Sequence, residues 1–276
     1  MHGTLAASRL TRSAKPKMQS AFQGHAELPG VRLWYTDTGG AGVPVVFLHA
    51  NTGNSESWEK NTPAFIAAGY RAIAFDRRGW GHSVADRASG PQPGSIAGDL
   101  NALVDFLGLD RFHLVGIAGG GYAAYDYVLW HPERLRSLVV AATGGGISEE
   151  EYGGRVRIPG FTALPPEYRE VSLSYIATNA DGLERWLHIH HHSQQEGAPS
   201  QPLHGEITFA KLETITMPTL MLPGGCDLTT PPYIMRAQKA HMPNAQFMVV
   251  PEAAHSVNWE QPEVFNRTVL DFIAKH

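Results

Sequence analysis

The segment from His113 to Ala123 has the residue types of a strand, a tight turn and a helix in direct succession. It reads His-Leu-Val-Gly-Ile-Ala-Gly-Gly-Gly-Tyr-Ala. Residues 116–120 match the Gly-x-Ser-x-Gly pattern of a nucleophile elbow except at the serine, where the chain has Ala118. Small neighbours are needed because the central residue of such an elbow sits in a strained turn. A methyl group has no proton to lose and no lone pair, so Ala118 excludes covalent serine catalysis.

Two shorter motifs precede this turn. Residues 47–51 read Phe-Leu-His-Ala-Asn, and residues 76–83 read Asp-Arg-Arg-Gly-Trp-Gly-His-Ser. The first resembles the strand and oxyanion loop of the α/β-hydrolase superfamily, and the second resembles its Asp-x-Arg-Gly-x-Gly-x-Ser turn. Because these motifs and the elbow occur in the family's order and spacing, the chain resembles that superfamily from about Val31 to Ala274.

The resemblance implies an α/β-hydrolase fold, which has a mostly parallel central sheet flanked by helices. It also implies a helical lid inserted after a core strand. The implied activity is that of an enzyme on a small, partly apolar organic carbonyl compound, such as an ester, a lactone or a β-keto acid. This chemistry needs no metal and no organic cofactor, so we expect a small-molecule substrate and no cofactor.

The family's remaining two catalytic positions fall on Asp227 and His255. Asp227 comes just after the strand-like run 219–222, and His255 follows the run 246–250. Parallel-sheet proteins bind their ligands at such strand ends. An aspartate there would hold the tautomer of the imidazole and stabilise its charged form, leaving the other ring nitrogen free as general base or acid. The resemblance also implies an oxyanion hole formed by the backbone N–H groups of Gly119 and Asn51, with the positive end of the following helix adding to it.

Two explanations of Ala118 stay open at this point. It is either a serine-to-alanine substitution that traps substrate, or the natural residue of a member without the serine; other relatives with alanine at this position favour the second. In a natural variant, His255 and Asp227 would activate water for attack on an ester or lactone. Alternatively, the oxyanion hole would stabilise an enolate while a C–C bond breaks, as in the decarboxylating methylketone synthase branch. A non-catalytic ligand-binding protein is the competing class, against which the surviving aspartate and histidine argue.

Further side chains could line a substrate cavity, although each also has a purely structural explanation. Histidines 188, 190, 191 and 192 fall on a predicted lid helix, and the spacing of His188 and His192 would suit two metal ligands. No glutamate completes a His-Glu-x-x-His arrangement, so we predict no metal site. The candidate substrate-binding residues are His49, Trp186, His188, His192 and Trp259.

Short β-rich runs alternate with helix-period segments from Val31 onward, which is typical of a parallel sheet covered by helices. Strands are predicted at residues 31–36, 44–49, 71–75, 112–117, 135–141, 219–222 and 246–250. Apolar stripes with helical spacing predict helices near residues 96–107 and 265–273.

This rhythm stops between Thr143 and Ala210, where helices are predicted only near residues 166–178 and 183–194. We therefore expect a helical lid at residues 144–210 and an α/β-hydrolase core made of residues 26–143 and 211–276. Residues 1–25 are expected to be a flexible N-terminal tail, with a transit peptide as the alternative.

Composition excludes several other classes of protein. The chain has 276 residues and a formal net charge of −4, which does not favour nucleic-acid binding. Its apolar runs are much shorter than the roughly 20 residues of a membrane helix. Cys226 is the single cysteine, so no intramolecular disulfide can form. A reducing, cytoplasmic location is expected, and the sequence leaves a homodimer open.

Overall fold

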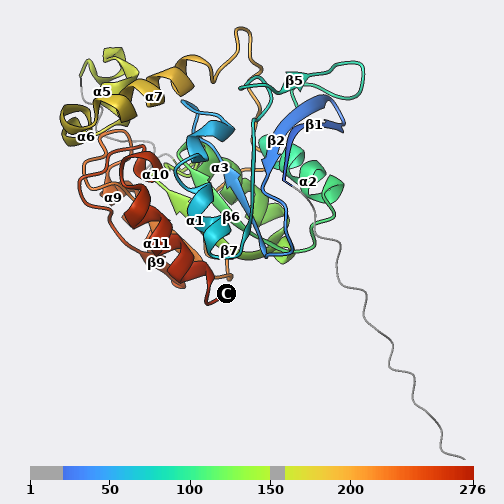
Figure 1. Cartoon of the computed structure of the whole chain (residues 1–276). Coiled ribbons are helices and arrows are strands. Elements are labelled where there is room, and N and C mark those ends of the chain that lie inside the picture. Colours follow the sequence, from blue (N-terminus) through green and yellow to red (C-terminus); the bar gives the residue numbers. More distant parts are fainter. Residues whose placement is uncertain (1–20, 150–158) are drawn as a thin grey trace, which may run out of the picture.

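One sheet of nine strands organises the part of the chain that the computed structural model describes, residues 21–149 and 159–276 (Figure 1). Its order is β1-β2-β4-β3-β6-β7-β8-β9, and β5 pairs with β2. Strand β2 is antiparallel to β1, β4 and β5, whereas the pairs from β4 to β9 are parallel. The strands are β1 (Phe22–Leu28), β2 (Val31–Asp37), β3 (Pro44–Leu48), β4 (Arg71–Phe75), β5 (Val84–Ala85), β6 (Phe112–Ile117), β7 (Leu135–Ala141), β8 (Thr219–Leu222) and β9 (Ala245–Phe247).

Helices cover both faces of this sheet because its central strands are apolar on both sides. In β6, Leu114 belongs to a buried cluster that includes Leu100 of α2, while the next residue, Val115, belongs to a second cluster that includes Phe265 of α11. Successive side chains of a strand point to opposite faces, so a continuous apolar run requires cover on each. The helices around the sheet are α1 (Thr62–Ala67), α2 (Ile96–Phe106), α3 (Gly119–Trp130), α9 (Pro232–Ala240), α10 (Val257–Glu260) and α11 (Pro262–Ile273).

The N-terminal boundary differs from the expectation. Strand β1 begins at Phe22 and pairs antiparallel with all of β2, so the tail expected to reach residue 25 overlaps a strand. The strand escaped sequence analysis because only Ala26 and Leu28 of its seven residues are buried, which leaves too little alternation to detect. Residues 1–20 lie outside the described part of the chain. At the other edge, β9 ends at Phe247, earlier than predicted.

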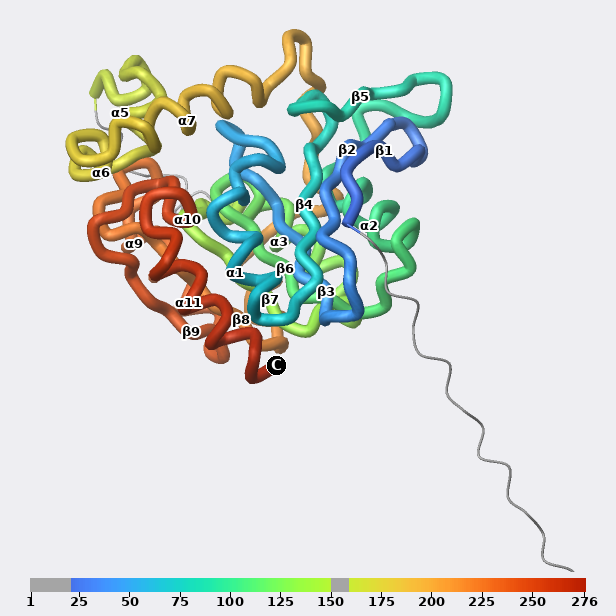
Figure 2. Tube along the Cα trace, viewed as in Figure 1, coloured from blue at the N-terminus to red at the C-terminus, as the bar shows by residue number. Residues whose placement is uncertain are grey.

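The segment expected to be a lid carries α5 (Pro166–Glu170), α6 (Leu173–Thr178), α7 (Ala180–His191) and α8 (Phe209–Leu212). Figure 2 shows α5, α6 and α7 together at one end of the molecule, beside α10. The single helix expected near residues 166–178 is two helices, because Ser172 is extended and caps α6 by accepting a hydrogen bond from the N–H of Tyr175. Helix α7 begins and ends three residues earlier than expected. Residues 150–158 of this segment lie outside the described part of the chain.

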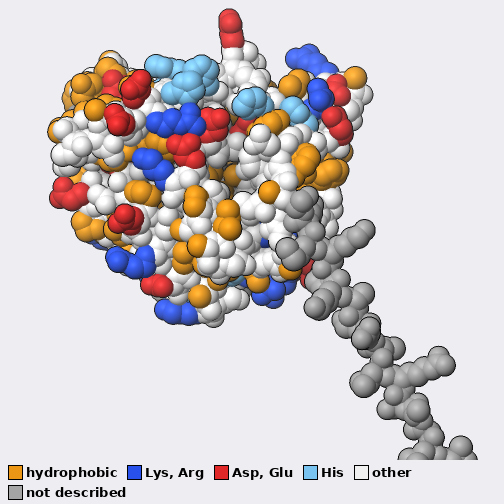
Figure 3. Space-filling model, viewed as in Figure 1, with side chains coloured by type: hydrophobic (Ala, Val, Ile, Leu, Met, Phe, Trp, Pro, Cys, Tyr) orange, Lys and Arg blue, Asp and Glu red, His pale blue; other side chains and the backbone are white. Residues whose placement is uncertain are grey.

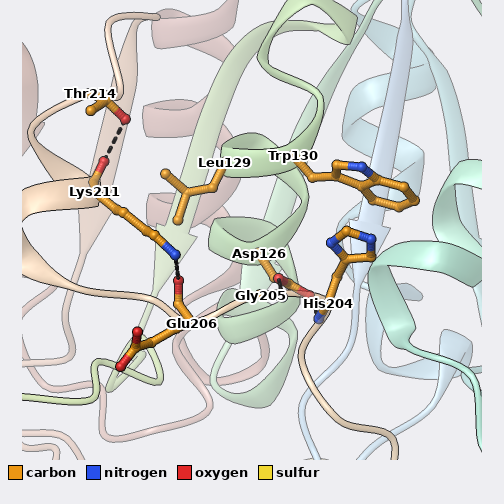
Figure 4. A pocket seen from close by; sticks show the side chains of 8 residues that line it. All are labelled: Asp126, Leu129, Trp130, His204, Gly205, Glu206, Lys211 and Thr214. Carbon is orange, nitrogen blue, oxygen red and sulfur yellow. Dashed lines mark hydrogen bonds between the residues drawn. The ribbon is translucent and has the colours of Figure 1, made fainter.

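The segment that follows α7 binds to α3 through His204 and Gly205. The carboxylate of Asp126 accepts hydrogen bonds from the backbone N–H groups of His204 and Gly205, at 2.6 and 3.0 Å. The rings of Trp130 and His204 stack with their centroids 3.8 Å apart (Figure 4). These contacts line a cavity of about 290 Å³. Its polar groups bond to one another, so we assign this cavity an anchoring role.

Candidate active site

Ala118 lies at the turn between β6 and α3, in a backbone conformation that L-residues rarely adopt, with φ 51° and ψ −116°. Its carbonyl accepts hydrogen bonds from the backbone N–H of Gly121 and the hydroxyl of Thr143, at 3.0 and 2.8 Å. A Cβ on Gly120 would lie 2.2 Å from the carbonyl oxygen of Leu48. Glycine is therefore required beside the turn, and the surrounding contacts hold Ala118 in its strained conformation.

His255 and Asp227 are brought together across 28 positions of sequence. The Nδ1 atom of His255 lies 2.8 Å from Oδ2 of Asp227, and both residues are buried. The other carboxylate oxygen, Oδ1, accepts the backbone N–H groups of Thr229 and Thr230, each at 2.8 Å. Asp227 is thus fixed by its own loop, and it orients the imidazole so that Nε2 points away from it.

A second acidic group, Glu170 at the end of α5, approaches the other ring nitrogen of this imidazole. Its Oε2 lies 3.9 Å from Nε2 of His255, and its side chain is 8% exposed. Sequence analysis missed Glu170 because it belongs to no motif and comes from the lid segment. A local signal is absent, since only the packing of α5 against the core brings the carboxylate to the histidine.

The electrostatic balance at His255 favours its protonated form. Burial lowers the pKa of His255, but the charges of Asp227 and Glu170 outweigh burial and raise the pKa to about 9. The hydrogen bond to Asp227 and the charge of Glu260 act in the same direction. Because a general base must be deprotonated, a reaction that uses this imidazole as a base should become faster as the pH rises toward 9.

The backbone N–H groups of Asn51 and Gly119 line the same space as His255. Within the described ranges, neither N–H donates to a protein acceptor. A Cβ on Gly119 would lie 2.0 Å from Oδ1 of Asn51, so the two residues are in close contact. The carbonyl of Asn51 accepts a hydrogen bond from Nε1 of Trp80 at 2.8 Å, which holds the loop in place. These two donors, one at the start of α3 and one in the loop after β3, suit a developing oxyanion.

These groups share a cavity of about 170 Å³. Carbonyl-compound chemistry needs a base, an oriented carbonyl and oxyanion donors around one such space. The lining residues are Ala50, Asn51, Thr52, Ala118, Gly119, Tyr122, Ala142, Gly144, Glu170, Thr229, Thr230 and His255.

We compared the sequence and the fold of this chain with those of known proteins. Residues 45–268 match the family model described as the alpha/beta hydrolase family. The chain belongs to this family. It is 30% identical over 290 residues to a 2-hydroxy-6-oxononadienedioate/2-hydroxy-6-oxononatrienedioate hydrolase of Paraburkholderia phymatum, covering 96% of this chain and 98% of that protein.

Two solved structures extend the comparison. A thermophilic esterase from Thermogutta terrifontis superposes with a TM-score of 0.76 at 26% identity, covering 93% of this chain and 99% of that one. An N-acyl homoserine lactone degrading enzyme gives a TM-score of 0.71 at 27% identity, covering 90% and 99%. The predicted α/β-hydrolase fold is therefore confirmed, and these three relatives are named as a hydrolase, an esterase and a lactone-degrading enzyme. Along residues 21–149 and 159–276, every helix is too short or too polar to cross a bilayer.

Three of the expected substrate-binding residues have structural roles in this alpha/beta hydrolase. His49 is buried, its Nδ1 lies 2.7 Å from the carbonyl oxygen of Ala50, and its Nε2 accepts the N–H of Arg77. Burial, followed by the charge of Arg77, lowers the pKa of His49 to about 3, so this imidazole is neutral. Trp186 and Trp259 pack together in the cluster that joins the lid segment to the core. None of the three lines the cavity beside His255, so the structure does not bring them to that site, and their substrate-binding role stays a prediction.

His188 and His192 are also outside the cavity. Their shared spacing places both on the exposed face of α7, with ring centroids 4.3 Å apart, while Trp186 and Ile189 occupy its buried face. Figure 3 shows histidine side chains gathered on the surface over α7. The structure therefore does not bring these two residues to the cavity beside His255, and substrate contact by them stays a prediction. No group of three or more metal-ligating side chains is found in the described ranges.

Proposed function

We propose that this alpha/beta hydrolase cleaves a small organic carbonyl compound, using His255 held by Asp227 and the N–H groups of Gly119 and Asn51 as oxyanion donors. The observation that carries the proposal is the 2.8 Å contact between His255 Nδ1 and Asp227 in a cavity shared with both amides. Ester hydrolysis, lactone hydrolysis and C–C cleavage next to a carbonyl all place negative charge on the carbonyl oxygen of the substrate. The esterase, lactone-degrading and oxononadienedioate hydrolase relatives support this range.

In this proposal Ala118 stands where other members carry the nucleophile, and water attacks directly. Nε2 of His255 takes one proton from water as the water oxygen bonds to the carbonyl carbon, and the carbonyl oxygen becomes an oxyanion. When the oxyanion collapses, the bond between the carbonyl carbon and the leaving alkoxide or enolate breaks. The imidazolium of His255 then gives its proton to that leaving group. No acyl-enzyme forms, because the Ala118 methyl group cannot be acylated.

The proposal is tested by turnover combined with intact-protein mass spectrometry. The chain is incubated with an aryl acetate, a γ-lactone and a β-keto acid, each measured for product and for protein mass. We expect turnover of at least one class with no adduct on the protein at any time. Saturable binding of these compounds without turnover of any would contradict the proposal and favour the non-catalytic ligand-binding protein.

Glu170 is proposed as a positioning residue that raises the pKa of the catalytic imidazole. In Glu170→Gln, loss of a negative charge 3.9 Å from Nε2 should lower the pKa of His255. The rising limb of the plot of kcat/KM against pH then moves to lower pH. At pH 7, the deprotonated fraction of His255 grows by about tenfold for each unit by which its pKa falls. Full pH profiles measure this effect. Glu167→Gln, on the same helix but outside the cavity, serves as the control, and coincident profiles for all three proteins would refute the role.

A further inference from the structure

Arg77 is buried and has no carboxylate partner among residues 21–149 and 159–276. The residue is 6% exposed and lines a cavity of about 230 Å³ together with Trp80, Tyr122 and Gln201. Its neighbour Arg78 forms an ion pair with Asp99 at 2.7 Å, whereas Arg77 has no ion pair within the described ranges. A buried guanidinium normally needs an anion, because removing an unpaired charge from water is costly.

The surroundings of Arg77 hold its guanidinium in place but leave it unsatisfied. Nη1 donates to Oδ1 of Asn51 at 2.7 Å, and the guanidinium carbon lies 3.7 Å from the centroid of the Trp80 ring. Its buried Nε finds no hydrogen-bond acceptor among the described residues. The Oε1 atom of Gln201, which lines the same cavity, is a buried acceptor that likewise finds no donor there. Burial lowers the pKa of Arg77 to about 9, so the group is still a cation at neutral pH.

This cavity adjoins the catalytic one. Asn51, Gly119 and Tyr122 line both spaces. The Oδ1 atom of Asn51, which accepts a hydrogen bond from Arg77, also lies against Gly119. A ligand whose carbonyl oxygen lies at the amide of Gly119 can reach Arg77 with a group only a few bonds away.

We propose that Arg77 is an anion subsite that binds a carboxylate of the substrate, so that the enzyme acts on carboxylic acids whose charged group lies close to the cleaved carbonyl. Arginine suits this role because its planar fork binds carboxylates through two parallel hydrogen bonds. Trp80 fixes the plane of that fork, and the two adjoining cavities admit only a small acid. The position of the substrate carbonyl in this inference rests on the proposed function. The binding of the anion by Arg77 does not depend on it.

Calorimetric binding tests the subsite without requiring turnover. The probes are pyruvate, 2-oxobutyrate and phenylpyruvate, each paired with its neutral amide. We expect the wild type to bind at least one acid more tightly than the corresponding amide. In Arg77→Gln, the affinity for that acid should fall by at least tenfold, while the affinity for the amide stays unchanged. Arg267→Gln, at an exposed position of α11, controls for a general loss of positive charge. Absence of any preference for the charged probes, or equal binding by Arg77→Gln, would overturn the subsite.

A second variant keeps the test decisive if Arg77→Gln fails to fold. Asn51→Asp preserves the shape of the side chain and places a carboxylate where Arg77 already donates, at 2.7 Å. The internal carboxylate should raise the melting temperature and weaken acid binding by at least tenfold. Unchanged acid binding in this variant would also overturn the proposal. If the acids bind as expected but no compound is turned over, the subsite stands and the proposed function fails.

Discussion

Replacing His255 by alanine should lower kcat by roughly 10²–10⁴-fold, the usual contribution of a positioned general base. The imidazole is the group held by Asp227 at 2.8 Å that also lines the cavity of Ala118, Gly119 and Asn51. The oxyanion donors and the substrate cavity would remain, so KM should change little. Steady-state assays of the compound identified by the turnover screen measure both constants.

Two further variants make this result interpretable. His255→Gln keeps most of the side-chain volume and can still bond to Asp227, but it cannot act as a base at neutral pH, so it should be as inactive as His255→Ala while folding normally. His188→Ala removes an exposed histidine of α7 and should retain full activity. Turnover of His255→Gln at the wild-type rate would eliminate the general-base mechanism.

The substitution Ala118→Ser should turn a protein that does not react with fluorophosphonates into one that is labelled stoichiometrically. The backbone at this position already has φ 51°, and Ala118 lines the same cavity as Gly119, Asn51 and His255, whose imidazole is held by Asp227. A serine hydroxyl there would meet an oriented base and a ready oxyanion hole, which are the requirements for an activated nucleophile. Intact-protein mass spectrometry and peptide mapping measure the labelling and its position.

A matched control is available at the end of the neighbouring strand. Ala142 also lines the cavity and also has a positive φ, of 44°, but it follows β7 rather than β6. Ala142→Ser should stay unlabelled, and adding His255→Ala to Ala118→Ser should abolish rapid labelling. A failure of Ala118→Ser to react would mean that this turn is not the nucleophile position. If labelling is accompanied by a large gain in ester cleavage, alanine replaced a catalytic serine; labelling without such a gain indicates a natural serine-free enzyme.

Much of the catalytic geometry could be predicted because it depends on local sequence. The turn at Ala118 needs small residues on both sides, and Asp227 and His255 each follow a β-rich run. The carboxyl ends of parallel strands meet at one edge of the sheet, so these positions imply proximity before any coordinates are known. Strands β2 and β3 were likewise predicted to within one residue at each end, because their apolar patterns are strong.

The residues around this centre could not be assigned in the same way. Trp186 and His188 are two positions apart on one helix, yet the first is buried against the core and the second is exposed. Helical periodicity separates the two faces, but it does not say which face meets the cavity or the rest of the protein. The candidate substrate contacts chosen by residue type alone therefore include none that line the cavity beside His255.

The sequence by itself determined the central strands of the sheet, the sharp turn at Ala118, and the positions of the histidine and the aspartate after their strands, because strand periodicity and small-residue turns act over a few neighbouring positions. Only the tertiary structure decided that Glu170 faces the imidazole and that Arg77, which lines the adjoining cavity, has no carboxylate partner in the described part of the chain. Those two facts depend on how α5 and the turn after β4 pack against distant segments. A charge is stabilised or left unpaired by its neighbours in space, and sequence order alone does not identify them.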